Sequence, residues 1–190
     1  MKFIFSFILA TTFLCANQIN LSAQLPNFHK KIKKMIKKTW KGENIDIKPL
    51  GTNYEKFSFP DRQLYTLKRE EKSIGLLAIN KAYGCHIDGC DDPSLERTDV
   101  SSSGYEDFYY AIFFNLNMTI KFVKVLEYDS EYGYEICGKR WLRQFEGHKG
   151  CDLKYEQDID GISGATVSAQ SIISDIANLC WLLSDFEFDK

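Results

Sequence analysis

The sequence is poor in the residues that mark fibrous, low-complexity and strongly charged proteins. Only 4 Pro and 12 Gly occur among 190 residues, which excludes a collagen-like or Pro/Gly-rich chain. The formal net charge is only −2, so the overall charge does not favour nucleic acid as a partner. Hydrophobic residues make up 44%, too many for a disordered chain. We therefore expect a single globular domain with a core of its own.

Long apolar runs are also scarce, and the longest one lies at the N-terminus. Met1-Lys2 precedes an apolar stretch from Phe3 to Ala16, shorter than the roughly 20 residues of a transmembrane helix. One positive charge before such a stretch is typical of a secretory signal peptide, here over residues 1–23 with cleavage after Ala23. The sequence thus predicts an exported protein, periplasmic or associated with the cell envelope. A buried N-terminal helix and lipidation at Cys15 are the alternatives.

Residues 24–42 have the pattern of a basic amphipathic helix. Apolar side chains recur at helical spacing, and lysines fill the positions between them. Two interpretations follow. The helix either contacts a membrane surface or an anionic partner, or packs on the domain with its lysines in solvent. The apolar positions are Phe28, Ile32, Met35, Ile36 and Trp40.

Residues 43–190 carry the pattern of one α+β domain. Paired apolar-rich runs predict two β-hairpins, over 63–67 with 74–80 and over 106–115 with 118–128. A loop is expected from Tyr83 to Gly104, and a short helix from Lys139 to Phe145. Apolar residues between Ala169 and Leu183 recur at i, i+3, i+4 and i+7, which predicts a last helix of roughly 16 to 18 residues. The expected architecture is a single domain of antiparallel hairpins packed with this C-terminal amphipathic helix.

The cysteines are numerous for a chain of this size. The predicted signal peptide removes one of the six, and export places the other five where disulfides persist. We expect a disulfide between Cys85 and Cys90, with a metal site as the alternative, and a pairing of Cys137 with Cys151. Cys180 falls on the apolar face of the last helix and is expected to be a buried free thiol.

A turn of small residues stands directly before the last helix, with the sequence Asp160-Gly161-Ile162-Ser163-Gly164-Ala165-Thr166. A helix start presents free backbone N–H groups and the positive end of the helix dipole, so such a turn suits a phosphate group. The alternative is a plain helix cap, with Ser163 or Thr166 as the capping residue.

The string Asp-x-x-Ser-Gly-Ala-Thr resembles the covalent flavinylation motif of the FMN-binding domain family. That family includes the FMN-carrying small subunits of the sodium-pumping NADH:quinone oxidoreductase and of the Rnf complex. The resemblance implies that a flavin transferase joins the FMN phosphate to the Thr166 hydroxyl as a phosphoester. It also implies cofactor contacts from the rest of the motif, namely Asp160, Ser163, Gly164 and Ala165.

A tethered FMN still needs an aromatic or apolar surface for its ring. Tyr132, Tyr134 and Trp141 are the candidate ring contacts, with core packing as the alternative for each. An electron carrier needs no catalytic acid, base, nucleophile or metal, and we predict none. The expected function is electron transfer between a membrane donor and an exported acceptor. An FMN-dependent reductase of a small substrate and a non-flavin, disulfide-stapled binding module are the alternatives.

Overall fold

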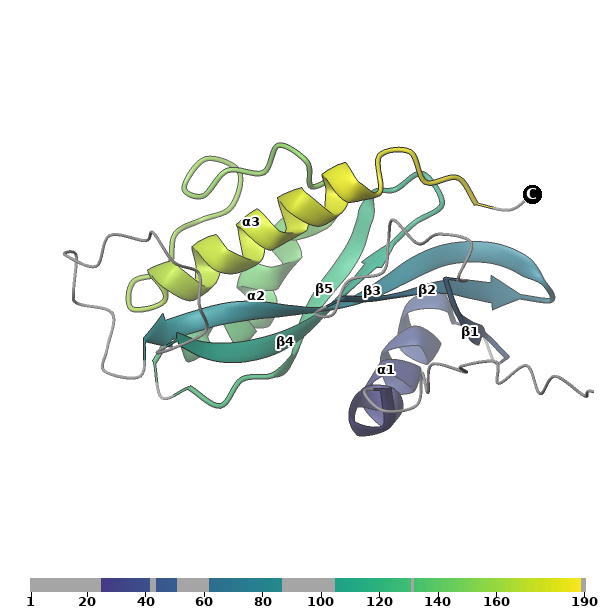
Figure 1. Ribbon diagram of the computed structural model, residues 1–190, viewed down its shortest axis with the longest axis horizontal. Coiled ribbons are helices and arrows are strands. Elements are labelled where there is room, and N and C mark those ends of the chain that lie inside the picture. Colours follow the sequence, from purple (N-terminus) through teal and green to yellow (C-terminus); the bar gives the residue numbers. More distant parts are fainter. Residues whose placement is uncertain (1–24, 42–43, 51–61, 87–104, 131, 189–190) are drawn as a thin grey trace, which may run out of the picture.

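Five antiparallel strands form a sheet whose two faces are covered by helices (Figure 1). The structure is a computed structural model, and it describes residues 25–41, 44–50, 62–86, 105–130 and 132–188. Each strand pairs with the next one along the chain. The single α+β domain with antiparallel hairpins is therefore confirmed. The strands are β1 (Asp46–Pro49), β2 (Arg62–Arg69), β3 (Lys72–His86), β4 (Tyr105–Phe114) and β5 (Ile120–Glu127).

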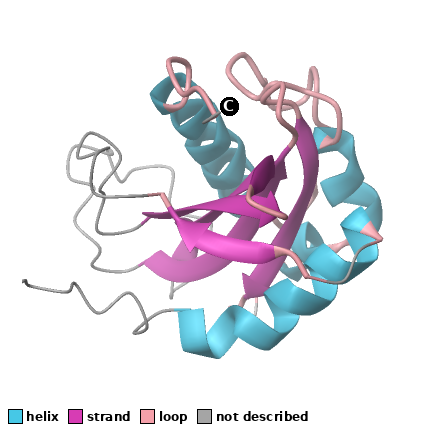
Figure 2. Cartoon of the chain, turned by 90° about the vertical axis from the view of Figure 1, so that its right-hand side faces the viewer, coloured by secondary structure: helices cyan, strands magenta, loops and turns pink. Residues whose placement is uncertain are grey.

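The helices divide between the two faces of the sheet. Helix α1 (Leu25–Trp40) covers one face and helix α3 (Thr166–Leu182) the other, as Figure 2 shows from the side. The shorter helices η2 (Tyr134–Cys137), α2 (Lys139–Leu142) and η3 (Arg143–Phe145) connect β5 to the chain that leads into α3. Helix α3 has 17 residues, within the predicted length.

The central strands β3 and β4 are apolar on both faces because both faces are covered. Successive side chains of a strand point to opposite sides, so Leu76 and Ala78 pack toward α3, whereas Leu77 and Ile79 pack toward α1. The sheet thus separates two apolar cores. This arrangement explains why the two hairpins could be recognised as nearly continuous apolar runs.

The apolar face of α1 is part of the second core. Phe28, Ile32 and Ile36 are exposed by only 8%, 0% and 4% and pack on β2, β3, β4 and β5. Their spacing of four residues places them in one stripe along the helix. The apolar face of α1 therefore packs on the domain, as the second interpretation predicted. Among the described residues, no helix is both long and apolar enough to cross a bilayer.

The structure differs from the prediction in two places. Strand β1 was not expected, and it pairs along β2 from Asp46 opposite Lys68. The prediction that a loop begins at Tyr83 is wrong. Tyr83 pairs with Asp107, and the strand β3 continues to His86. The predicted signal peptide and residues 87–104 lie outside the described residues.

Candidate functional site

The turn before α3 leaves the start of this helix open. Thr166 is the first residue of α3 and is exposed, while Ala165 is the N-cap residue and is buried. None of the described side chains caps the helix by a hydrogen bond, so the predicted alternative of a Ser163 or Thr166 cap is wrong. Gly164 has a φ of +80°, and a Cβ built there meets nothing within 4 Å. The turn therefore offers open space beside the first backbone N–H groups of the helix.

The segment of α2 and η3 holds the beginning of this turn. The indole Nε1 of Trp141 donates to the carbonyl oxygen of Asp160 at 2.8 Å, and the N–H of Asp160 donates to Oε1 of Gln144 at 2.8 Å. Trp141 is only 7% exposed and packs edge-on against Phe145 at 5.2 Å. Its contact with a flavin ring stays a prediction. The structure gives it the role of positioning the turn.

A tyrosine-bearing loop lies against the first turn of α3. A Cβ built on Gly133, whose φ is +77°, comes within 2.6 Å of the Tyr128 hydroxyl and 3.5 Å of the Ala165 Cα. Gly133 is flanked by Tyr132 and Tyr134, whose side chains are 53% and 67% exposed. The structure thus brings these two predicted ring contacts to the motif, with their side chains largely in solvent.

The Tyr128 hydroxyl joins this loop to α3. It donates to the carbonyl oxygen of Tyr132 and lies 3.0 Å from the Ser168 Oγ. A hydroxyl has one proton, so Ser168 is the donor in the second bond. Burial raises the pKa of Tyr128, which keeps this hydroxyl protonated at neutral pH. We call Tyr128, Ser168 and Gly133 the loop latch.

The loop latch was missed at the level of sequence, although one signal was available. Ser168 falls within the first turn of α3 and is completely buried. A buried hydroxyl needs a hydrogen bond partner, because an unpaired one costs about 1–3 kcal/mol. A serine among the buried positions of an apolar helix therefore indicates a polar contact, but the sequence does not say with which strand or loop.

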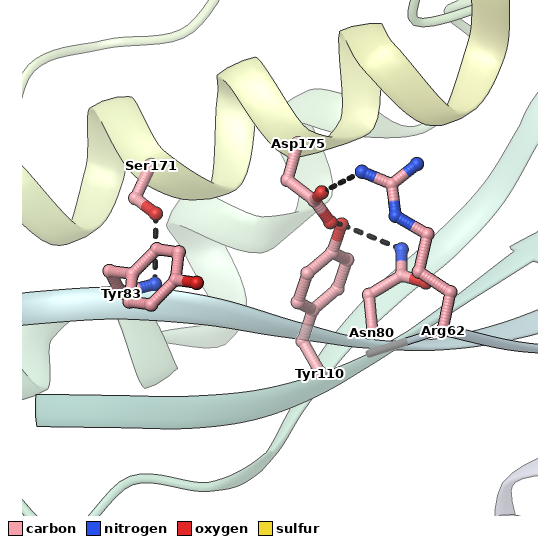
Figure 3. A network of polar contacts seen from close by, with 6 residues as sticks. All are labelled: Arg62, Asn80, Tyr83, Tyr110, Ser171 and Asp175. Atoms are coloured by element: carbon pink, nitrogen blue, oxygen red, sulfur yellow. Dashed lines mark hydrogen bonds and ion pairs between the residues drawn. The ribbon is translucent and has the colours of Figure 1, made fainter. Parts of the chain in front are cut away.

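A second polar cluster fixes the middle of α3 to the sheet (Figure 3). Asp175 forms an ion pair with Arg62 of β2 and accepts a hydrogen bond from the Tyr110 hydroxyl of β4. Asn80 of β3 donates to the same hydroxyl at 2.9 Å. Burial raises the pKa of Asp175 and, more strongly, that of Tyr110. We call these four residues the anchor cluster.

The cysteines pair differently from the prediction. Cys151 forms a disulfide with Cys180, and Cys137 is a free thiol within the part of the chain that the structure describes. The predicted pairing of Cys137 with Cys151, and the free Cys180, are therefore wrong. Cys180 lies in the last turn of α3, where it faces the segment that follows η3, a proximity that helical periodicity does not reveal. The predicted bond between Cys85 and Cys90 lies outside the described residues.

The comparison with known families concerns the part of the chain that builds this site. Residues 104–179 match the model of the FMN-binding domain. The matched stretch runs from β4 through the loop latch and the Asp160–Thr166 turn to the later part of α3. No curated protein compared with the chain matches it. The segment that carries the candidate site is therefore similar to an FMN-binding domain, which supports the binding of FMN.

Proposed function

We propose that this protein is an exported electron-transfer protein that carries FMN through a phosphoester to Thr166. The observation that carries the proposal is the exposed Thr166, the first residue of a helix without a side-chain cap. This residue lies inside the stretch that matches the FMN-binding domain.

The start of α3 fits the phosphate end of FMN. The first N–H groups of a helix have no partner within it, and the helix dipole adds about half a positive charge at this end. A phosphate ester on Thr166 would lie beside these donors. Gly164 leaves room for it, because even a built Cβ at this position has no neighbour within 4 Å. The buried methyl of Ala165 and the bonds that Trp141 and Gln144 make to Asp160 keep the turn in place.

The neighbouring side chains fit the other end of the cofactor. Tyr132 and Tyr134 offer exposed aromatic rings beside the first turn of α3. Glu106 has a buried carboxylate oxygen, Oε2, without a donor among the described residues, and its charge acts on the nearby Tyr128 hydroxyl. The polyhydroxylated chain of FMN carries hydroxyl donors of the kind that such an oxygen accepts.

Bound FMN would supply the reversible uptake and release of electrons, and the chain would bind and orient it. A covalent tether prevents dissociation, which suits a protein exported away from the pool of free flavin. The attachment requires a flavin transferase as partner, and the electrons require a membrane donor and an exported acceptor. A relation to the sodium-pumping NADH:quinone oxidoreductase and Rnf subunits belongs to the same proposal.

The test is the intact mass of the protein after co-expression with a flavin transferase. We expect a mass increase of FMN less one water, since the ester forms with net loss of water, and a yellow colour that persists after denaturation. Thr166→Ala should lose both. Thr166→Ser is the matched control, because it removes only a methyl group and keeps a hydroxyl at the same place, so it should retain the adduct.

Two outcomes would contradict the proposal. One is a wild-type protein of unmodified mass in the presence of an active transferase. The other is an unchanged adduct on Thr166→Ala, which would place the attachment elsewhere. Circular dichroism of both variants establishes that they are folded.

A further inference from the structure

Helix α1 carries a stripe of lysines on its outer side. Lys30, Lys33, Lys34, Lys37 and Lys38 follow i, i+3, i+4, i+7 and i+8, so they share one face of the helix, and all five are exposed. We call them the lysine stripe. With 3.6 residues per turn, this face lies opposite the buried stripe of Phe28, Ile32 and Ile36. The lysines therefore point away from the sheet.

The helix itself supplies no negative charge beside the lysine stripe. The sequence of α1, LPNFHKKIKKMIKKTW, contains no acidic residue. On the sheet side of the molecule, Lys48 forms an ion pair with Glu71, and Lys81 forms one with Asp107. The formal net charge of −2 thus hides a strongly positive helix on an otherwise acidic chain.

We infer that the lysine stripe docks this protein on the surface of a bilayer that contains anionic lipids. Each lysine near such a surface strengthens binding about fivefold, so a row of them gives measurable binding. A protein partner is the less suitable occupant. Protein interfaces are depleted of lysine, and their energy comes from Trp, Tyr and Arg. Among the described residues, none of the exposed large hydrophobic side chains lies on α1.

The structure also determines how the docking would work. Amphipathic helices that bind membranes usually insert their apolar face between the lipids. In α1 this face is occupied, because Phe28, Ile32 and Ile36 are buried against the sheet. Binding would rest on charge alone and would disappear when salt screens it.

Docking through α1 would orient the candidate site. Helix α3 lies on the opposite face of the sheet (Figure 2), so the Thr166 end of the molecule would be on the side turned away from the lipid. This inference does not depend on the proposed flavin, since the lysine stripe lies outside residues 104–179.

The experiment is co-sedimentation of the purified protein with vesicles of phosphatidylglycerol and phosphatidylcholine in equal parts, and with pure phosphatidylcholine. The test variant replaces Lys30, Lys33, Lys34 and Lys38 by Gln. The matched control replaces four exposed basic residues of the other face, Lys139, Arg140, Lys149 and Lys154, by Gln and so changes the net charge equally. Circular dichroism checks that both variants fold.

We expect binding to the anionic vesicles alone, and release at about 1 M salt, where the Debye length is about 3 Å. The α1 variant should bind about 600-fold more weakly, since it lacks four lysines worth about fivefold each, and the control should bind like wild type. Equal losses in both variants would overturn the inference, because they would show a general charge effect. Binding that persists in salt, an absence of binding to anionic vesicles, and binding only to an acidic protein would also overturn it.

Discussion

The two faces of the sheet are held by different kinds of contact. On the α1 face, apolar side chains such as Ile32 and Phe113 are completely buried, and Lys31 adds a hydrogen bond to the carbonyl oxygen of Leu126. On the α3 face, the apolar core is joined by the anchor cluster, the loop latch and the disulfide of Cys151 with Cys180.

This difference follows from what each helix has to do. Most contacts of α1 are apolar and not directional, and hydrogen bonds from Lys31 to the Leu126 carbonyl oxygen and from Arg69 to the Trp40 carbonyl oxygen add direction to them. Hydrogen bonds and ion pairs have defined distances and angles, so the anchor cluster and the loop latch fix the position of α3 along the sheet. The first residue of α3 is Thr166, and the position of its hydroxyl depends on the position of the whole helix.

The largest effect is expected on the α1 face. Ile32 is fully buried, so Ile32→Ala removes apolar contacts and leaves a cavity, which should lower the free energy of unfolding by about 4 kcal/mol. Flavin attachment per folded molecule should not change. Urea unfolding and intact mass measure the two quantities, with the exposed Lys33→Ala as control. Loss of the adduct from folded Ile32→Ala protein would show that the α1 face also positions the site.

The next effect concerns the covalent link on the α3 face. The disulfide joins residues 29 positions apart, and the entropy of the loop that it closes predicts a stabilisation of about 3.6 kcal/mol. The double variant Cys151→Ser/Cys180→Ser should lose this stability in thermal unfolding. Cys137→Ser, which removes the free thiol, should lose much less. Equal losses would mean that the bond does not contribute in solution.

The sequence was sufficient for the elements whose signal is local. The two hairpins were predicted from paired apolar-rich runs, and the last helix from apolar residues that repeat with period 3.6. The turn from Asp160 to Thr166 was found because its small residues and its resemblance to a known motif both lie in one continuous stretch. Tyr132 and Tyr134 are exposed near this turn, and their contact with a flavin ring stays a prediction.

The sequence was insufficient wherever two distant segments meet. Tyr128 and Ser168 are 40 residues apart, and Arg62 and Asp175 are 113 residues apart. Each residue alone looks like an ordinary surface or core position, and only the folded sheet brings the partners together. The same reason explains the wrong prediction for Cys180, whose partner is set by the path of the chain after η3.

A smaller effect is expected in the loop latch, where two glycines allow a matched comparison. Gly133 and Gly147 have φ values of +77° and +88°, so alanine is strained by about 1–2 kcal/mol at both. Only at Gly133 does the new Cβ collide, at 2.6 Å from the Tyr128 hydroxyl; at Gly147 it meets nothing within 4 Å. Gly133→Ala should therefore also reduce the flavin adduct, measured by intact mass, and Gly147→Ala should not. An unchanged amount of adduct in both variants would show that the conformation of this loop does not affect flavin attachment.

The smallest effect is a pH dependence from the anchor cluster. Burial holds the pKa of Asp175 in the folded protein above its ordinary value of about 3.9. At a pH between these two pKa values, the folded protein keeps a proton that the unfolded chain has released. The contribution of Asp175 to stability is thus complete below about pH 3.9 and is lost as the pH rises through the raised folded pKa. The slope of this loss is at most about 1.4 kcal/mol per pH unit.

Asp175→Asn should abolish this slope, because an amide does not titrate in this range, whereas the exposed Asp152→Asn should keep it. Urea unfolding of the three proteins between pH 4 and pH 7 measures the difference, with roughly 1 unit between points. Such a slope would belong to the α3 face, since the apolar contacts of Phe28, Ile32 and Ile36 carry no titrating group. A wild-type stability that rises more steeply with pH than that of Asp175→Asn would mean that Arg62 outweighs burial at this carboxylate, and the anchor cluster would then be a stabilising ion pair rather than a positioning device.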